Sequence, residues 1–118
     1  MIAPEVWELL YYRTLASQLP FREWQESLAD LRAATAVARR LERFRNGLFG
    51  DCEAVGEGVF EFRIDLGPGY RGYFFRTGRR VILLLCGGDK KTQAADSAKA
   101  KQFRRDYEQR TSGALGSG

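Results

Sequence analysis

The chain of 118 residues contains no histidine. This absence excludes every catalytic triad or dyad that depends on an imidazole base, and it removes a common nitrogen ligand of zinc. Any acid–base chemistry must therefore come from Lys, Arg, Tyr, Asp or Glu side chains. Cysteine is also scarce, since Cys52 and Cys86 stand alone at a separation unlike that of metal ligands. We expect two reduced, mostly buried thiols, no metal and no cofactor.

Long apolar runs are missing as well. The longest run, Val81–Cys86, falls far short of the ~18 residues that a membrane span needs. Residues 1–14 lack the basic start and the cleavage site of a signal peptide. We therefore expect a cytoplasmic protein without a membrane segment. The composition and length predict a single folded domain over residues 1–110, followed by a small, polar, flexible tail over residues 111–118.

The charges are distributed unevenly along the chain. Residues 1–60 contain seven Lys and Arg against nine Asp and Glu, a net of −2, whereas residues 61–118 contain twelve against six, a net of +6. A basic C-terminal half indicates a polyanionic partner such as nucleic acid. A solvated basic face without a partner would have the same composition.

Apolar residues recur at steps of three and four between Phe21 and Phe44, which predicts an amphipathic helix. The stretch DLRAATA leaves room for a bend that would divide it into a helical hairpin. Pro20 suits the first turn and Asn46-Gly47 a C-terminal stop. Four arginines near the helix end are favoured by the helix dipole and are interpreted as structural or solvated. They are Arg39, Arg40, Arg43 and Arg45.

Strand patterns lie on both sides of this helical region. Residues 6–15 are rich in aromatic and apolar side chains and predict a first strand. A period of two begins after Gly47. The continuous apolar run Val81–Cys86 indicates a strand buried on both faces, which is expected to stop at Gly87-Gly88. The strands predicted there cover residues 49–55, 58–66, 70–76 and 79–86.

A last helix is predicted over residues 92–110, with Thr92 as its N-cap. Its apolar stripe consists of Ala95, Ala98, Phe103 and Tyr107. The fold class is therefore α+β. We expect a small twisted antiparallel sheet with an N-terminal helix or helical hairpin packed on one face, and a C-terminal helix.

The two turns of the sheet determine which side chains share a face. A three-residue loop at Gly67–Gly69 and a two-residue turn at Thr77-Gly78 would pair Arg63 with Tyr73 and Tyr73 with Ile82. The side chains then expected against the long helix are Phe60, Phe62, Ile64, Leu66, Phe74, Val81, Leu83 and Leu85. Those expected on the opposite face are Arg63, Asp65, Arg71, Tyr73 and Arg80, above a floor of Ile82 and Leu84, with Lys90 and Lys91 near the rim.

The stretches LPFREWQESL, GVFEFRIDLGPGYRGYFF and VILLLCGGDKKTQ occur in this order. Together they resemble the RelE/ParE toxin superfamily, and most closely its HigB-like branch of addiction module killer proteins. The likeness runs from about residue 9 to about residue 107. Gly72 departs from the pattern where a bulky β-former is expected, and Lys91 departs where a small polar residue is expected. We expect Gly72 to weaken the sheet locally by ~1 kcal/mol.

The resemblance implies a RelE-like fold and a bacterial toxin of a type II toxin–antitoxin system. Its partner would be a cognate antitoxin, in this branch typically a helix-turn-helix DNA-binding protein, and a heterotetramer is one assembly that the two could form. RelE-like and HigB-like members cut messenger RNA on the ribosome, whereas ParE-like members poison DNA gyrase. We expect a ribosome-dependent endoribonuclease, with a non-enzymatic gyrase inhibitor as the alternative and a plain RNA-binding module as a third candidate, because fold alone does not decide.

Arg63 lies at the strand position where RelE-like toxins carry a phosphate-contacting arginine. We expect Arg63 and Arg71 to clamp the phosphate, because a guanidinium binds phosphate oxygens in a bidentate manner. Lys90 or Tyr73 would supply acid–base chemistry if nearby cations lower its pKa. The expected catalytic residues are therefore Arg63, Arg71, Tyr73 and Lys90.

Other polar residues have supporting or alternative roles in this scheme. Arg80 and Lys91 are expected to bind RNA at the edge of the basic face. Asp89 is either a base or a helix cap, with the cap favoured. Tyr107 is either a counterpart of the C-terminal tyrosine of some RelE relatives or, more simply, a core residue. Glu61, Arg63 and Asp65 would otherwise only neutralise one another.

Overall fold

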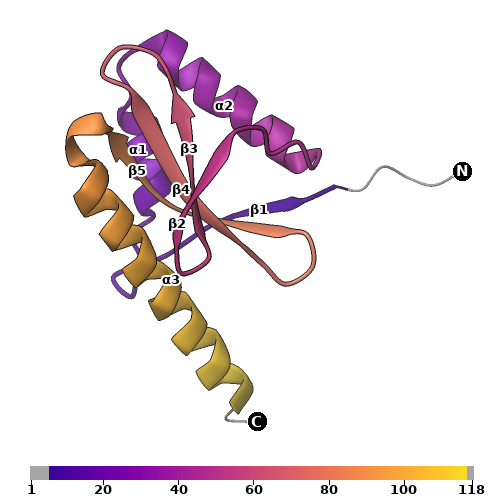
Figure 1. Cartoon of the computed structure of the whole chain (residues 1–118). Coiled ribbons are helices and arrows are strands. Elements are labelled where there is room, and N and C mark those ends of the chain that lie inside the picture. The colour runs from indigo at the N-terminus through magenta and orange to yellow at the C-terminus, as the bar shows by residue number, and fades with distance from the viewer. Residues whose placement is uncertain (1–5, 117–118) are drawn as a thin grey trace, which may run out of the picture.

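The computed structural model describes residues 6–116, with side chains up to residue 112. Helices cover both faces of a five-stranded sheet (Figure 1). On one face lie α1 (Pro20–Ser27) and α2 (Leu31–Arg45), and on the other lies α3 (Gln93–Gly116), which follows the short 3₁₀ turn η1 (Lys90–Thr92). The strands are β1 (Glu8–Tyr11), β2 (Cys52–Gly56), β3 (Val59–Ile64), β4 (Tyr70–Thr77) and β5 (Val81–Asp89). The predicted α+β class is confirmed.

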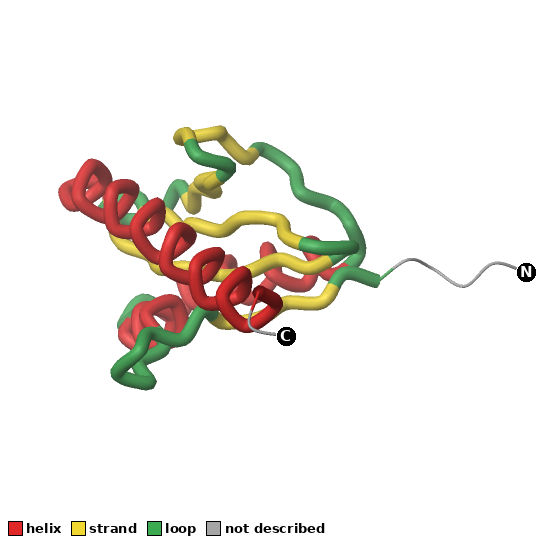
Figure 2. Tube along the Cα trace, turned by 90° about the horizontal axis from the view of Figure 1, so that it is seen from below, coloured by secondary structure: helices red, strands yellow, loops and turns green. Residues whose placement is uncertain are grey.

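The strands are ordered β1-β5-β4-β3-β2 across the sheet. β1 runs parallel to β5, while the other neighbours are antiparallel, so the sheet is mixed. The expectation of a purely antiparallel sheet is wrong for this one pair. A hydrophobic pattern identifies a strand, but it does not specify the direction in which that strand meets a neighbour far away in sequence. The long α3 lies across the strands in Figure 2.

The helical region is a hairpin of two helices, which confirms the second of the two predicted forms. Pro20 opens α1, where its missing N–H costs no hydrogen bond. The chain breaks after Ser27, and the Asp30 carboxylate accepts a hydrogen bond of 2.9 Å from the backbone N–H of Arg32. Gly47 takes a left-handed φ of +75° just after α2 ends.

The start of α3 is capped one turn earlier than predicted. Asp89, rather than Thr92, accepts hydrogen bonds from the backbone N–H groups of Lys91 at 2.9 Å and Thr92 at 3.2 Å. The interpretation of Asp89 as a helix cap is confirmed. The strand does not stop at Gly87-Gly88 either, because β5 continues to Asp89.

The predicted stripe of α3 is partly wrong. Ala95 and Ala98 are exposed, and the alanine that packs against the sheet is Ala100, together with Phe103 and Tyr107. The helix continues to Gly116, beyond its expected end at residue 110, while residues 117 and 118 of the predicted flexible tail lie outside the described residues.

The β3–β4 hairpin places the candidate arginines on the predicted face. Ile64 pairs with Tyr70, so the loop between the strands is two residues longer than expected. An even shift leaves every side chain on its own face. Arg63 therefore pairs with Arg71, and Glu61 with Tyr73, all on the face that α3 partly covers.

The β4–β5 hairpin departs from prediction by an odd shift. Thr77 pairs with Val81 across a three-residue turn, and a bulge between Tyr73 and Phe74 adds one residue to β5. Val81 is half-buried. Ile82 and Leu84 therefore pack beneath α1 and α2, whereas Leu83 and Leu85 face α3, the reverse of the expectation. Arg80 lies in the β4–β5 turn, with a φ of 61°. Arg71 lies near the other end of β4, so Arg80 is not part of the basic face, contrary to the prediction.

Gly72 has a packing role that the sequence does not reveal. It pairs directly with Phe62 across β3 and β4. A Cβ atom at Gly72 would lie 2.2 Å from the Phe62 ring. The ring thus occupies the space of the missing side chain, so the glycine is required by the core beneath α1 and α2.

We predict that Gly72→Ala lowers the free energy of unfolding by about 1–3 kcal/mol, because the added methyl group overpacks the core. Urea denaturation of the single variant, of Phe62→Leu and of the double variant measures this effect. The alanine should cost less in the Phe62→Leu background, where the ring is gone. An equal cost in both backgrounds would contradict the packing argument.

Candidate functional site

The centre of the site is a buried carboxylate on β3. Glu61 is only 1% exposed. It accepts hydrogen bonds from Arg63 Nε at 2.9 Å, from the Tyr73 hydroxyl at 2.9 Å and from Gln93 Nε2 at 3.1 Å. The Nε atom of Arg71 lies 3.6 Å from the same oxygen, Oε1, that Arg63 contacts. Side chains from β3, β4 and α3 thus converge on one negative charge.

Hydrogen bonding determines the protonation states in this cluster. Burial raises the pKa of Glu61, but the hydrogen bonds from Arg63, Tyr73 and Gln93 outweigh it and hold the pKa below its usual value. Burial, and then the bond to Glu61, raises the pKa of Tyr73 well above its usual value. Glu61 is therefore ionised and Tyr73 protonated at neutral pH. The pKa of Tyr73 is shifted in the direction opposite to the one that a role in acid–base chemistry would need.

Two arginines stand directly opposite each other beside this carboxylate. Arg63 and Arg71 are cross-strand partners, an arrangement that is unfavourable for like charges. Glu61 offsets the repulsion, and Glu53 contacts Arg63 Nη2 at 2.6 Å. Arg71 is only 9% exposed and its buried Nε makes no hydrogen bond. Its guanidinium is therefore held by charge rather than saturated by hydrogen bonds.

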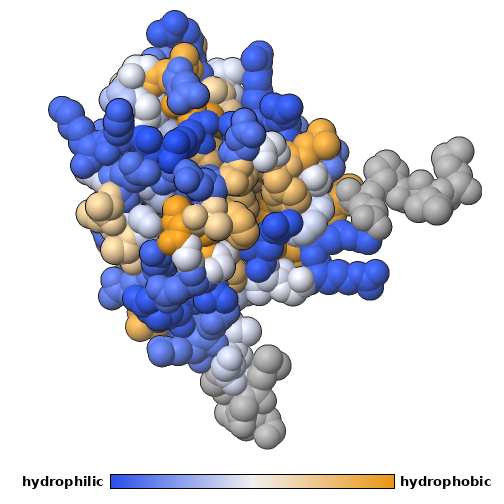
Figure 3. Space-filling view, in the orientation of Figure 1, coloured by the Kyte–Doolittle hydropathy of each residue, from blue (hydrophilic) through white to orange (hydrophobic). Residues whose placement is uncertain are grey.

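The two guanidinium groups open into a pocket of about 360 Å³, which we call the loop pocket. Residues 63–71 and Lys90 line it. The backbone N–H of Lys90 donates to the carbonyl of Gly69 at 2.9 Å, which fastens the start of η1 to the β3–β4 loop. The exposed Lys90 side chain forms no ion pair with any described residue. Figure 3 shows hydrophilic residues gathered at this end of the molecule, around the start of α3.

The structure thus brings together most of the residues that the sequence singles out. Arg63, Arg71 and Lys90 share the loop pocket, and Tyr73 lies behind them against Glu61. Lys91 is exposed and does not line this pocket. Arg80, in its distant turn, is not part of the site.

Gln93 and Arg40 are contributors that were not predicted. Gln93 reaches Glu61 from the first turn of α3, and nothing in the local pattern indicates this contact. Arg40, which was interpreted as structural or solvated, donates to the Arg63 carbonyl at 3.1 Å and to the Asp51 carbonyl at 3.4 Å. It thereby supplies a hydrogen-bond donor to the β3 backbone at Arg63, just beyond the last residue of β3 that pairs with β2.

The cysteines lie apart from this cluster. Both are free thiols, and burial raises the pKa of Cys52 and that of Cys86, the latter to about 12. Among residues 6–116 no group of three or more His, Cys, Asp or Glu side chains could hold a metal ion. Over the same range, none of the helices combines the length and the apolar character that crossing a bilayer requires.

The structure is that of a small α+β protein, and comparison with known sequences identifies the family to which the chain belongs. The chain is a member of the family described as Phage derived protein Gp49-like (DUF891), whose model matches residues 23–108. That family is associated with toxin–antitoxin modules. The matched segment contains the whole loop pocket.

A relative from Haemophilus influenzae, described as an uncharacterized protein, is 42% identical over 87 residues. The alignment covers 74% of this chain and 88% of the relative. No solved structure matches the chain significantly.

We predict that Glu61→Gln removes part of the acid sensitivity of folding. A carboxylate whose pKa is lowered in the folded state stabilises the fold at pH values above its ordinary pKa of 4.5. This contribution is lost as the pH falls through the pKa of the folded state. The variant should lose about 1–3 kcal/mol at neutral pH, because Arg71 is left without its counter-charge. It should then lose less than the wild type on acidification.

Urea denaturation at neutral pH and at several lower pH values measures this difference. Glu26→Gln is the control, because Glu26 forms an exposed ion pair with Arg22 and lies away from the cluster. An unchanged pH dependence in Glu61→Gln would contradict the assigned role of the carboxylate.

Proposed function

We propose that this protein is the toxin of a toxin–antitoxin module and that it cleaves messenger RNA on the ribosome. The family association supports the toxin class. One observation supports cleavage: Arg71, nine-tenths buried and incompletely hydrogen-bonded, shares a pocket with Arg63 and Lys90. A buried cation of this kind binds an anion strongly, because it has already lost its hydration.

The chemistry required is attack of a ribose 2′-OH on the neighbouring phosphorus. The O2′–P bond forms as the P–O5′ bond breaks, the proton of the 2′-OH passes to solvent water, and the leaving O5′ gains a proton. The products are a 2′,3′-cyclic phosphate and a 5′-hydroxyl. Negative charge grows on the non-bridging oxygens, where Arg63 and Arg71 bind bidentately. Lys90 donates the proton to O5′, since it is the exposed ammonium at the pocket rim.

Tyr73 acts indirectly in this proposal. It is fully buried, and its hydroxyl donates a hydrogen bond to Glu61 rather than facing the pocket. By fixing Glu61, it keeps the two arginines in place, so it is a positioning residue. The cognate antitoxin is the expected protein partner, and translating ribosomes in the cytoplasm are the expected site of action.

The test is primer extension on messenger RNA from a reconstituted translation reaction, with and without the purified protein. New 5′ ends in phase with codons, absent when ribosomes are omitted, are the expected result. Intact messenger RNA from a protein that still stops growth would overturn the proposal. Inhibition of DNA supercoiling in a gyrase assay would then favour the gyrase alternative.

Variants of the clamp make a sharper prediction. Arg71→Ala and Arg63→Ala should each slow cleavage by roughly 100-fold or more, because a donor to the developing charge is lost. Arg71→Lys tests geometry, since it keeps the charge without the bidentate contact. Tyr73→Phe should reduce the rate less than either alanine variant.

Arg105→Ala is the matched control. Arg105 contacts Glu57 at the surface of α3 and lies outside the loop pocket. Circular dichroism and urea denaturation establish that each variant is folded. A folded Arg71→Ala or Arg71→Lys protein that cleaves at the wild-type rate would contradict the clamp.

A further inference from the structure

A second group of cationic side chains lies on α2, where two arginines one helical turn apart face the solvent. Arg39 and Arg43 are exposed, and their side chains form no ion pair or hydrogen bond with any described residue. Like charges at this spacing repel each other. Many exposed arginines elsewhere have an acidic partner, as in Arg22–Glu26 and Arg105–Glu57. The positive charge on this turn is therefore uncompensated within the described part of the chain.

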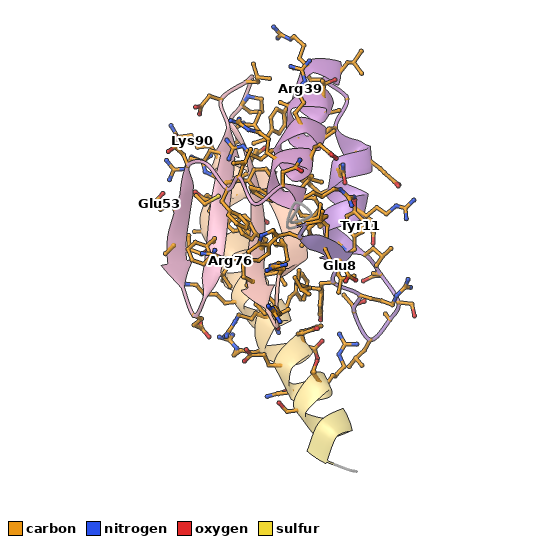
Figure 4. All side chains as sticks on the ribbon, turned by 90° about the vertical axis from the view of Figure 1, so that its right-hand side faces the viewer. Glu8, Tyr11, Arg39, Glu53, Arg76 and Lys90 are labelled. Carbon is orange, nitrogen blue, oxygen red and sulfur yellow. The ribbon has the colours of Figure 1, made fainter. Side chains whose placement is uncertain are left out.

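These arginines border a hollow that continues into the loop pocket. The hollow has a volume of about 360 Å³ and is lined by Ala36, Arg39, Arg40, Arg43 and residues 63–66. Residues 63–66 also line the loop pocket, so the two hollows adjoin at the end of β3 and are treated together as one groove. Figure 4 shows Arg39 and Lys90 toward the same end of the molecule. We call this surface the arginine groove.

The charge along the arginine groove is strongly one-sided. A single carboxylate, Asp65, lines it. The cations that line it are Arg39, Arg40, Arg43, Arg63, Arg71 and Lys90. A field of this kind attracts a polyanion and not merely one phosphate.

An adjoining hollow is lined mainly by carboxylates, and it restricts the direction in which a bound strand can run. It is lined by Cys52 and by two arginines, Arg40 and Arg63, which it shares with the groove. Its carboxylates are Asp51, Glu53, Glu61 and Asp65. This acidic wall repels phosphate, so a bound strand is directed along α2 rather than over β2.

We propose that the arginine groove binds the backbone of single-stranded RNA beyond the phosphate in the loop pocket, with Arg39 and Arg43 contacting neighbouring phosphates. This inference rests on the proposed function, because it takes the loop pocket as the place of the reacting phosphate. Guanidinium groups suit the task, since they bind phosphate oxygens bidentately and carry a permanent charge. Arg40 fixes the strand edge, whereas Arg39 and Arg43 are free to reach the ligand.

The experiment measures binding of a short, fluorescent RNA oligonucleotide by anisotropy at several salt concentrations. Its riboses are 2′-O-methylated, so it cannot be cleaved. Each phosphate contact to a single strand contributes about 0.7 to the slope of log affinity against log salt. Arg39→Gln/Arg43→Gln should therefore bind more weakly at low salt and reduce the slope by about 1.4. Asp65→Asn should bind more tightly than the wild type.

Arg79→Gln/Lys99→Gln is the matched control, with the same loss of charge. Both residues are exposed and neither lines the arginine groove. The slope of log affinity against log salt for this double variant should stay at the wild-type value. An equal loss in both double variants, no loss in Arg39→Gln/Arg43→Gln, or no binding by the wild type would each overturn the proposal.

The two proposals fail in different ways. If the wild type cleaves messenger RNA but Arg39→Gln/Arg43→Gln binds the oligonucleotide like the wild type, the groove is wrong and the proposed function stands. If the wild type leaves messenger RNA intact but the salt slope of Arg39→Gln/Arg43→Gln decreases as predicted, the groove binds RNA and the cleavage proposal is wrong.

Discussion

The carboxylate of Glu61 is ionised although almost no solvent reaches it. It must be, because β3 and β4 place two arginines directly opposite each other, and one oxygen of Glu61 contacts Arg63 and lies near Arg71. Without that charge, the arginines would repel each other and Arg71 would be a buried, unpaired cation. With it, the group of three keeps one net positive charge, and Glu53 contacts this group through Arg63. The proposed binding of a phosphate in the pocket and the stability of the sheet thus depend on the same side chain.

The rest of the fold is arranged around this cluster. α3 covers the sheet only as far as Gln93, which closes the cluster from above and leaves Arg63 and Arg71 facing the pocket. The Asp89 cap starts η1 beside the β3–β4 loop, and the bond from Lys90 to Gly69 joins the two. On the other side of the sheet, Arg40 secures the strand edge on which Arg63 lies. Helix starts and strand edges therefore position the candidate site, and no long loop is involved.

Alternation along single strands was enough to predict much of this arrangement. Glu61 and Arg63 share a face with Arg71 and Tyr73 because β3 and β4 differ from the expected register by an even number of residues. The next hairpin differs by an odd number, so Ile82 and Leu84 pack on the opposite side to that expected. The length of a turn and the presence of a bulge depend on backbone geometry that residue types do not determine. The Gln93 contact depends in turn on where α3 docks, which is a tertiary property.

The parallel pairing of β1 with β5 has a consequence for how the chain folds. Glu8 pairs with Val81, so the two strands that meet are separated by roughly 70 residues, and their pairing closes the largest loop in the sheet. β5 lies between β1 and β4, and it is the last strand in the chain. Any fragment that ends before β5 leaves β1 without a strand neighbour and β4 with an open edge. Assembly of the sheet therefore waits for β5, and the strand that comes first in the chain is among the last to be paired.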